Sequence, residues 1–289
     1  MTDHPVKIRL QHVGKSYPVR QRTPGGEPVF QALHDVNLSV REGEFLTLVG
    51  QSGCGKTTLL ELLCGLSLPT TGSITVDGQP VQGPGLDRGI VFQQYALFPW
   101  RTALRNVEFG LEAKGVPRRE RAERARDHLA LVGLQGFEQH YPHELSGGMK
   151  QRVAIARSLS YDPGILLMDE PFGALDEQTR ESLQRALLRI WQRTGKTIVF
   201  ITHSIDEAVY LGQRVAVMQP RPGRIETIVE VPLAKQADEH DVRADPQFVA
   251  LRHEVWKLVR DTGAAPRTAE GAAAGNAARP ARLAHLEMA

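Results

Sequence analysis

Hydrophobic and polar positions change their spacing several times along the chain. Between Val6 and Val40 apolar and polar residues alternate, and Gly- and Pro-containing breaks such as RTPGGEP interrupt the alternation. A period of two is typical of strands with one buried face, so this region predicts short antiparallel strands and hairpins. The stretch GSITVDGQPV predicts another hairpin, with its turn near Asp77 and Gly78.

Three apolar runs, EFLTLVG, GILLMD and TIVFITH, predict buried strands of a parallel sheet, because such strands are apolar on both faces. A helix is predicted directly after the first run, over residues 56–63. Between the other two runs, apolar residues at helical spacing predict a second helix with one buried face. These residues are Leu183, Leu187, Ile190 and Trp191.

Helical spacing dominates from about residue 104 to residue 159. Within it, RRERAERARDHLALVG has a charged and an apolar face, which is typical of a helix at the surface. Together the patterns indicate an α/β fold with a mainly parallel sheet and an inserted helical block. Residues 262–289 are rich in Ala, Gly, Pro and Arg without apolar periodicity, and we expect a disordered tail there.

Composition limits the classes of protein that the chain can represent. Its 289 residues can bury a substantial core, and 35 Lys and Arg against 33 Asp and Glu do not favour a nucleic-acid binder. Cys54 and Cys64 match neither a zinc motif nor a disulfide framework, which indicates a reducing compartment. The N-terminus lacks an apolar signal-peptide region, and LLELLCGLSL is interrupted by Glu61, so we expect any membrane role to require a partner.

The segment GQSGCGKTT follows the first apolar run and precedes a helix, which is the context of a phosphate-binding loop (P-loop). Its glycines allow backbone amides to face phosphates, Lys56 supplies a charge for the β- and γ-phosphates, and the Thr57 hydroxyl can bind Mg²⁺. At Cys54 we expect the amide to matter, and no redox role. The candidate nucleotide-binding residues are Gly50, Gln51, Ser52, Gly53, Cys54, Gly55, Lys56, Thr57 and Thr58.

Two carboxylates end the second apolar run. Asp169 would bind Mg²⁺ through its water shell, and Glu170 would polarise the water that attacks the phosphate. The alternative is that this acidic strand end caps the next helix. His203, at the end of the third run, could hold the γ-phosphate, although a lone histidine is more often structural.

A second anion site is predicted in LSGGMKQRVAIAR. Ser146 is a good N-cap, and Gly147 and Gly148 leave the first amides of the following helix uncovered. Such a helix start binds anions, so the chain carries two phosphate-binding features. The apolar positions that would pack this helix are Val153, Ile155, Ala156 and Leu159.

Over roughly residues 8–260, the motifs and their order resemble those of the ATP-binding subunits of ATP-binding-cassette (ABC) transporters. Tyr17 in KSYPV resembles the aromatic residue that stacks on adenine, and Gln93 in VFQQYALFPW resembles the Q-loop glutamine. LSGGMKQR resembles the family signature, GALD ending at Asp176 resembles the D-loop, and His203 resembles the switch histidine.

The resemblance implies a P-loop NTPase core with an N-terminal antiparallel β subdomain and a helical signature subdomain at about residues 95–160, within a cassette covering 1–261. It implies hydrolysis of ATP with Mg²⁺. In such cassettes the signature of one subunit closes over ATP on the P-loop of the other, so we expect a head-to-tail homodimer. The implied catalytic residues are Glu170, His203 and Gln93, the implied Mg²⁺ ligands are Thr57, Gln93 and Asp169, and the implied signature residues are Ser146, Gly147 and Gly148.

The segments GPGLDRGIVFQQYALFPWRTALRNVEFGLE and QPRPGRI, with Met149 where many cassettes have glutamine, resemble the nitrate, sulfonate and taurine importer group. This resemblance implies two integral-membrane permease subunits, an indirect partnership with a periplasmic or extracellular substrate-binding protein, and no direct contact with nucleic acid. It places the chain at the cytoplasmic face of the cell membrane as a peripheral subunit. Only about seventy residues follow Met218, many of them in the low-complexity tail, so we do not expect the regulatory domain of maltose-type importers.

Two other functions remain as alternatives. A soluble ABC ATPase acting in translation or DNA repair usually has two cassettes in one chain or long heptad segments, and neither is found here. A degenerate, regulatory cassette would have lost Lys56, Glu170 or His203, which are present. Three aromatic residues after Gln93 either belong to the core or line a groove for a short permease helix. They are Tyr95, Phe98 and Trp100.

Overall fold

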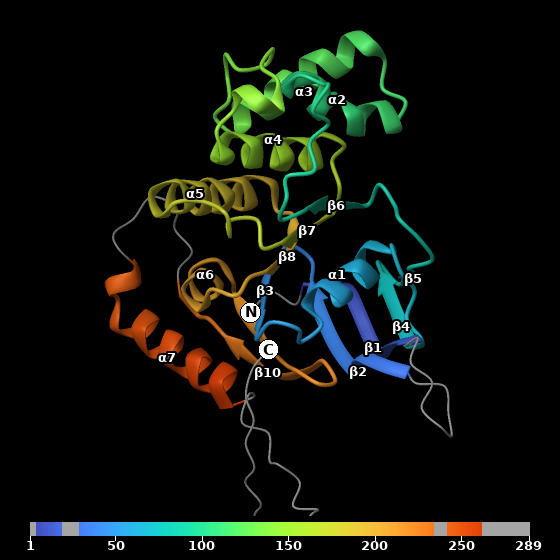
Figure 1. The fold of residues 1–289 in the computed structure, drawn as a ribbon, viewed down its shortest axis with the longest axis vertical. Helices are drawn as coiled ribbons and strands as arrows, with labels where there is room; N and C mark the ends of the chain where they lie inside the picture. Colours follow the sequence, from blue (N-terminus) through green and yellow to red (C-terminus); the bar gives the residue numbers. More distant parts are fainter. Residues whose placement is uncertain (1–3, 19–28, 234–241, 262–289) are drawn as a thin grey trace, which may run out of the picture.

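A computed structural model describes residues 4–18, 29–233 and 242–261 of the chain. Its central feature is a six-stranded sheet with the order β10-β9-β3-β8-β7-β6 (Figure 1). All neighbouring strands from β9 to β6 are parallel, and β10 is antiparallel to β9, so the predicted mainly parallel sheet is confirmed. The strands are β3 (Phe45–Gly50), β6 (Arg88–Val91), β7 (Ile165–Asp169), β8 (Thr197–Ile201), β9 (Arg214–Gln219) and β10 (Arg224–Glu230).

A second, antiparallel sheet has the order β2-β1-β4-β5. Its strands are β1 (Val6–Pro18), β2 (Val29–Arg41), β4 (Thr71–Val76) and β5 (Gln79–Pro80). The prediction of short strands before residue 41 is wrong in length, since β1 and β2 have 13 residues each. Register shifts, for example between Leu10 and Val13, let β1 continue where the alternation is interrupted. The segment RTPGGEP lies outside the described residues.

The predicted hairpin is confirmed as β4 and β5. Asp77 and Gly78, between the strands, have φ angles of 49° and 75°. Positive φ at both central residues is the requirement of a type I′ turn, which matches the twist of antiparallel strands.

Helix α1 (Lys56–Cys64) lies between the two sheets and shares one apolar core with both. Leu46 and Leu48 of β3 face this core, whereas Phe45 faces the core on the opposite side of the sheet. Side chains of a strand alternate between faces, so one run of apolar residues serves two cores. The run at 165–169 behaves in the same way, with Leu167 on the α1 side and Leu166 on the other.

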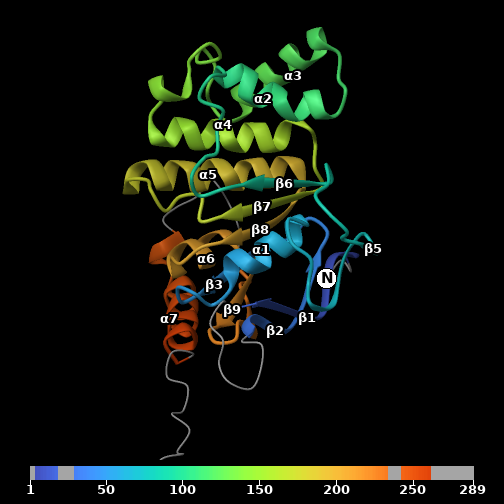
Figure 2. The same cartoon turned by 45° about the vertical axis from the view of Figure 1, so that its right-hand side comes forward.

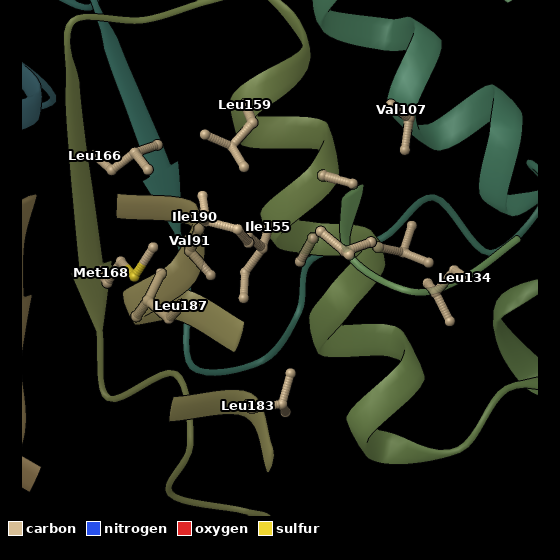
Figure 3. Packing of buried hydrophobic residues seen from close by; sticks show 14 of the residues in the cluster. Val91, Val107, Leu134, Ile155, Leu159, Leu166, Met168, Leu183, Leu187 and Ile190 are labelled. Carbon is tan, nitrogen blue, oxygen red and sulfur yellow. The ribbon is translucent and has the colours of Figure 1, made fainter. Parts of the chain in front are cut away.

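The helical block covers that other side of the sheet (Figure 2). Its elements are α2 (Ala103–Ala113), α3 (Arg118–Leu131), the 3₁₀ turn η1 (Pro142–Glu144) and α4 (Gly147–Ser160), with α5 (Glu177–Thr194) between α4 and the sheet. Ile155 and Leu159 of α4 lie against Leu166 of β7 and Leu187 of α5 (Figure 3). The four positions predicted to pack α4 are all buried.

The other helix predictions also agree with the structure. In α3 only Ala125 and Leu129 are buried, as expected for a surface helix. In α5 the predicted leucines and Ile190 are buried, and Trp191 is half-buried with its indole N–H donating to the Gly43 carbonyl at 2.9 Å.

The sequence patterns do not predict several elements of the structure. These are β6, β9, β10, α6 (Ile205–Leu211), the 3₁₀ turn η2 (Val242–Ala244) and α7 (Pro246–Asp261). Helix α7 packs on α6 and β9 through Phe248 and Val255, which are buried. The predicted tail, residues 262–289, lies outside the described residues. No helix in the described part of the chain has both the length and the apolar character needed to cross a bilayer.

Candidate active site

The P-loop turns sharply between β3, which ends at Gly50, and α1. Gly53 and Gly55 have φ angles of 76° and 92°, which glycine adopts without steric cost. A Cβ on Gly55 would lie 2.6 Å from Leu33 Cδ2, so the loop also needs glycine there to pack on β2. The local sequence therefore folds as the phosphate-binding motif requires.

Lys56 lies inside the P-loop. Its side chain is mostly buried, and Nζ donates to the carbonyls of Gly50 at 2.7 Å and Gln51 at 3.1 Å. Cys54 is also buried, with Sγ 3.8 Å from the same Nζ. Burial raises the pKa of the Cys54 thiol, against a smaller opposite effect of Lys56, which lowers the fraction of reactive thiolate.

One pocket joins the P-loop to the acidic end of β7. It is lined by Glu170, by Phe30 and Ala32 of β2, and by the P-loop residues Ser52, Gly53, Gly55, Lys56, Thr57 and Thr58. Gln51 points elsewhere, since its amide donates to the Val259 carbonyl of α7 at 3.2 Å. The predicted phosphate loop and the predicted base therefore share one cavity.

Thr57 and Asp169 come together at the side of this pocket, with the threonine hydroxyl 3.5 Å from Asp169 Oδ2. Burial raises the pKa of Asp169, and the neighbouring Glu170 adds to the effect, while Thr57 and Lys56 oppose it. Two oxygen donors beside a phosphate loop suit Mg²⁺, which keeps several of its own waters and binds phosphates. The residues present therefore fit this ion.

Glu170 and His203 lie next to each other. His203 Nδ1 is 2.9 Å from Glu170 Oε2, and the residues follow the adjacent parallel strands β7 and β8. The sequence predicts His203 as the last residue of its strand. In the structure β8 ends at Ile201, so His203 lies two residues beyond the strand. Helix α5 is capped by Asp176, whose Oδ1 accepts from the Thr179 amide at 3.0 Å, so the alternative role of the acidic strand end as a cap is wrong.

Gln93 approaches the same place. A Cβ built on Gly173 would lie 3.7 Å from Gln93 Nε2 and 3.9 Å from His203 Cε1. Gly173 follows Glu170 by three residues, and its amide donates to the Glu170 carbonyl at 3.2 Å. The structure thus brings Gln93, Glu170 and His203 around one loop.

The signature motif has the predicted local geometry. Ser146 caps α4, and its Oγ accepts from the Met149 amide at 3.3 Å. A Cβ on Gly147 would lie 3.1 Å from Tyr95 Oη, whereas one on Gly148 would clash with Thr179 at 2.4 Å, so Gly148 is also needed for packing.

This motif is separate from the P-loop pocket of its own chain. None of Ser146, Gly147 and Gly148 is among the residues that line that pocket. Helix α4 and helix α1 lie on opposite sides of α5 and strands β6 to β8 (Figure 2). Within one chain, the two predicted phosphate-binding features therefore do not form one site.

Phe30 is a pocket residue that the sequence analysis missed. It is 56% exposed and pairs with Tyr17 across β1 and β2, so the two rings project from the same face of the sheet. Tyr17 itself is half-buried, with Lys15 Nζ 5.1 Å from its ring centre, and it does not line the pocket. Only the strand register could have revealed the pairing of the two aromatic residues.

Comparisons with known proteins identify the family. The sequence model described as ABC transporter matches residues 33–173. An uncharacterised ABC transporter ATP-binding protein of Methanocaldococcus jannaschii is 56% identical over 256 residues, which cover 89% of this chain and 92% of that protein. The chain belongs to the ABC transporter family. It is an ATP-hydrolysing cassette with a P-loop NTPase fold.

Other relatives carry more specific names. A taurine import ATP-binding protein of Pelagibacter ubique is 49% identical, covering 82% of this chain and 91% of its own length. A nitrate import ATP-binding protein of Synechocystis is 50% identical, covering 79% of this chain and 88% of its own length. A solved ATP-binding cassette, a dimer in a post-hydrolysis state with ADP and Pi, has a TM-score of 0.68 and 36% identity, covering 78% of this chain and all of that one.

Proposed function

We propose that this cassette is the ATPase subunit of an importer for a small anion such as nitrate, an aliphatic sulfonate or taurine. The observation that carries the proposal is the identity of about one half, over about four fifths of the chain, to proteins named for taurine import and nitrate import. The substrate itself would be selected by the permease and a binding protein outside the cell membrane, and not by this subunit.

In the proposed reaction the P-loop amides and Lys56 hold the phosphates of ATP, and Tyr17 stacks on the adenine. Thr57, Asp169 and Gln93 would hold Mg²⁺, whose charge offsets the charge of the β- and γ-phosphate oxygens. Their roles rest on the short Thr57–Asp169 separation and on the approach of Gln93 to the loop after Glu170.

Glu170 is the proposed general base. Its carboxylate lines the P-loop pocket, where it can accept a hydrogen bond from a water that attacks the γ-phosphate. His203 contacts this carboxylate and is more than half exposed, so its ring is open to solvent and would contact the γ-phosphate. The pair therefore orients the water and contacts the group that is transferred.

We further propose that ATP is held between two copies of the chain arranged head to tail. Each P-loop would then face Ser146 and the glycine amides of the other copy, because the signature lies apart from the pocket of its own chain. Asp176 of the D-loop would lie at the same junction. ATP binding would join the subunits, and hydrolysis with phosphate loss would let them separate.

The contact with the permease is assigned to aromatic residues after the Q-loop. Phe98 packs on Phe109, with ring centres 4.7 Å apart, and Arg157 stands over its ring, so it serves the helical block. Trp100, by contrast, is 72% exposed beside Phe98. An exposed aromatic anchor of this kind suits a short amphipathic helix of the permease. The cassette would thus sit at the cytoplasmic face of the cell membrane.

A photo-crosslinking amino acid at position 100, introduced into the full chain in cells, tests this assignment. We expect crosslinks to a protein with several membrane spans, and much weaker crosslinking from position 249, which is exposed on α7. Crosslinks from position 100 to ribosomal or DNA-repair proteins would support the alternative class of soluble ABC ATPases. Uptake of labelled taurine, sulfonate and nitrate by cells carrying Glu170→Gln then identifies the substrate.

A further inference from the structure

Arg180, on the first turns of α5, supports the loop that connects Glu170 to this helix. Its Nη2 donates to the Leu175 carbonyl at 2.8 Å, and its Nε donates to the Phe172 carbonyl at 3.4 Å. These two carbonyls lie on either side of Gly173 and Ala174. One guanidinium therefore holds both ends of the segment that follows the proposed general base.

Glu207, on α6, supports the turn that carries His203. The residue is 6% exposed, and its Oε2 accepts from the Thr202 hydroxyl at 2.5 Å. The Thr202 hydroxyl oxygen in turn accepts from the Ser204 amide at 3.0 Å. His203 thus stands between two residues whose positions depend on this buried carboxylate.

Arg180 and Glu207 form an ion pair that joins the two supports. Arg180 Nε lies 3.7 Å from Glu207 Oε1, which also accepts from the Gln184 amide at 3.2 Å. Burial raises the pKa of Glu207, while its hydrogen bonds and Arg180 oppose this effect. A buried charge is costly without partners, so Arg180, Thr202 and Gln184 stabilise the ionised form of this carboxyl.

Both groups also line a small cavity with the two site residues. Its walls include Glu170, Gly173, Arg180, His203 and Glu207. The ion pair and the 2.9 Å contact between Glu170 and His203 therefore border the same cavity. A shift of either support would change that contact directly.

We infer that Arg180 and Glu207 are positioning residues that hold Glu170 and His203 in their relative geometry. The inference rests on the roles proposed above for Glu170 and His203. Neither Arg180 nor Glu207 lines the P-loop pocket, so their loss affects turnover and not ATP binding. Catalytic groups act efficiently only within a fraction of an ångström of the productive position.

The test uses Arg180→Met and Glu207→Gln in the full chain, with turnover expressed per ATP-binding site counted by nucleotide titration. Glu207→Gln keeps the size of the side chain, but it removes the charge and replaces one of the two acceptor oxygens, which serve Thr202 and Gln184, by an NH2 group. We expect kcat to fall by roughly 10- to 100-fold, as for a catalytic group misplaced by about an ångström, while KM and the ATP dissociation constant stay within about 3-fold.

The double variant tests whether the two residues act as one unit. Because each single change breaks the same ion pair, the double variant should lose no more turnover than the more impaired single variant. Arg180→Lys should recover part of the loss, since an ammonium can pair with Glu207 but cannot hold both carbonyls. Arg185→Met is the matched control on α5, where Arg185 makes an exposed ion pair with Glu181 and should leave turnover unchanged.

Normal turnover per site in Arg180→Met would overturn the inference. A double variant whose loss of turnover equals the product of the two single losses would also overturn it, because the two residues would then act independently. An equal fall in ATP affinity and turnover would also overturn it, because this would show a general structural role. The proposed role of Glu170 is tested separately by Glu170→Gln. If that variant hydrolyses ATP normally, the assignment of the general base is wrong, whatever the result for Arg180→Met.

Discussion

His203 Nδ1 lies 2.9 Å from Glu170 Oε2, although 33 residues separate the two in the chain. Their strands are neighbours in the parallel sheet, and the Glu170 amide donates to the Ile201 carbonyl at the end of β8 at 3.0 Å. The sheet therefore places the proposed base and His203 together. Glu170 adopts a φ of 41°, which is uncommon for a residue with a side chain.

The first prediction concerns the general base. Glu170→Gln should keep ATP binding and lower turnover by roughly 10²- to 10⁴-fold, the range expected for loss of an acid–base group. Steady-state phosphate release and nucleotide titration measure the two effects separately. Lys56→Ala should instead abolish tight nucleotide binding, because Lys56 is the cation inside the P-loop.

A matched control for the base is Glu120→Gln on α3, which removes an exposed carboxylate in an ion pair with Arg124. Surface ion pairs of this kind contribute little, so its turnover should equal that of the unchanged chain. Full hydrolysis by Glu170→Gln would contradict the assignment.

The second prediction concerns adenine. Tyr17→Ala should weaken ATP binding by roughly 1 to 3 kcal/mol, as for other bases stacked on aromatic rings, and Tyr17→Phe should be tolerated. Phe30→Ala is the informative comparison, because Phe30 lines the P-loop pocket while Tyr17 stands beside it on the next strand. If only Phe30→Ala weakens binding, the stacking role belongs to Phe30 and not to Tyr17.

The third prediction concerns the two cysteines. Burial raises the pKa of the Cys64 thiol to about 12 and also raises that of Cys54. A thiol whose pKa is raised is ionised to a smaller extent at pH 8, and only the thiolate reacts. Both cysteines should therefore resist a colorimetric thiol reagent until the protein is denatured. Cys54→Ala should also keep ATPase activity, because the backbone amide remains. Rapid labelling of the native chain would contradict this account.

Motifs that depend on local sequence could be predicted from the sequence. The P-loop, the N-cap at Ser146 and the hairpin turn at Asp77 and Gly78 each need particular residues at fixed spacing, and the structure has them. The parallel strands were also evident, since residues 165–169 and 197–201 are apolar on both faces. These features are decided within a few residues of the chain.

Features that depend on distant contacts could not be predicted. The place of Phe30 at the pocket follows from its pairing with Tyr17 in a register interrupted by bulges. The ion pair of Arg180 and Glu207 joins two helices whose relative position is set by the sheet. Phe98 is less exposed than Trp100 because Phe109 of α2 and Arg157 of α4 pack against its ring. Alternation and spacing contain no information on such neighbours.

The central claim is that two copies of the chain complete each ATP site. Ser146→Asp keeps a good N-cap but places a negative charge where the signature would meet phosphate, and Ser146→Asn is the neutral control with the same capping ability. Gly148 is a poorer choice, because a Cβ there would clash with Thr179 and disturb the packing of α4 on α5.

The most direct measurement is ATP hydrolysis by a mixture of Lys56→Ala and Ser146→Asp chains. Each variant alone should be nearly inactive, whereas Ser146→Asn should remain active. In an equal mixture, activity should return to at most about a quarter of the normal value, because half of the dimers are mixed and each mixed dimer has one intact site of two. No recovery at any mixing ratio, from two variants that are each folded, would contradict a site shared between two chains.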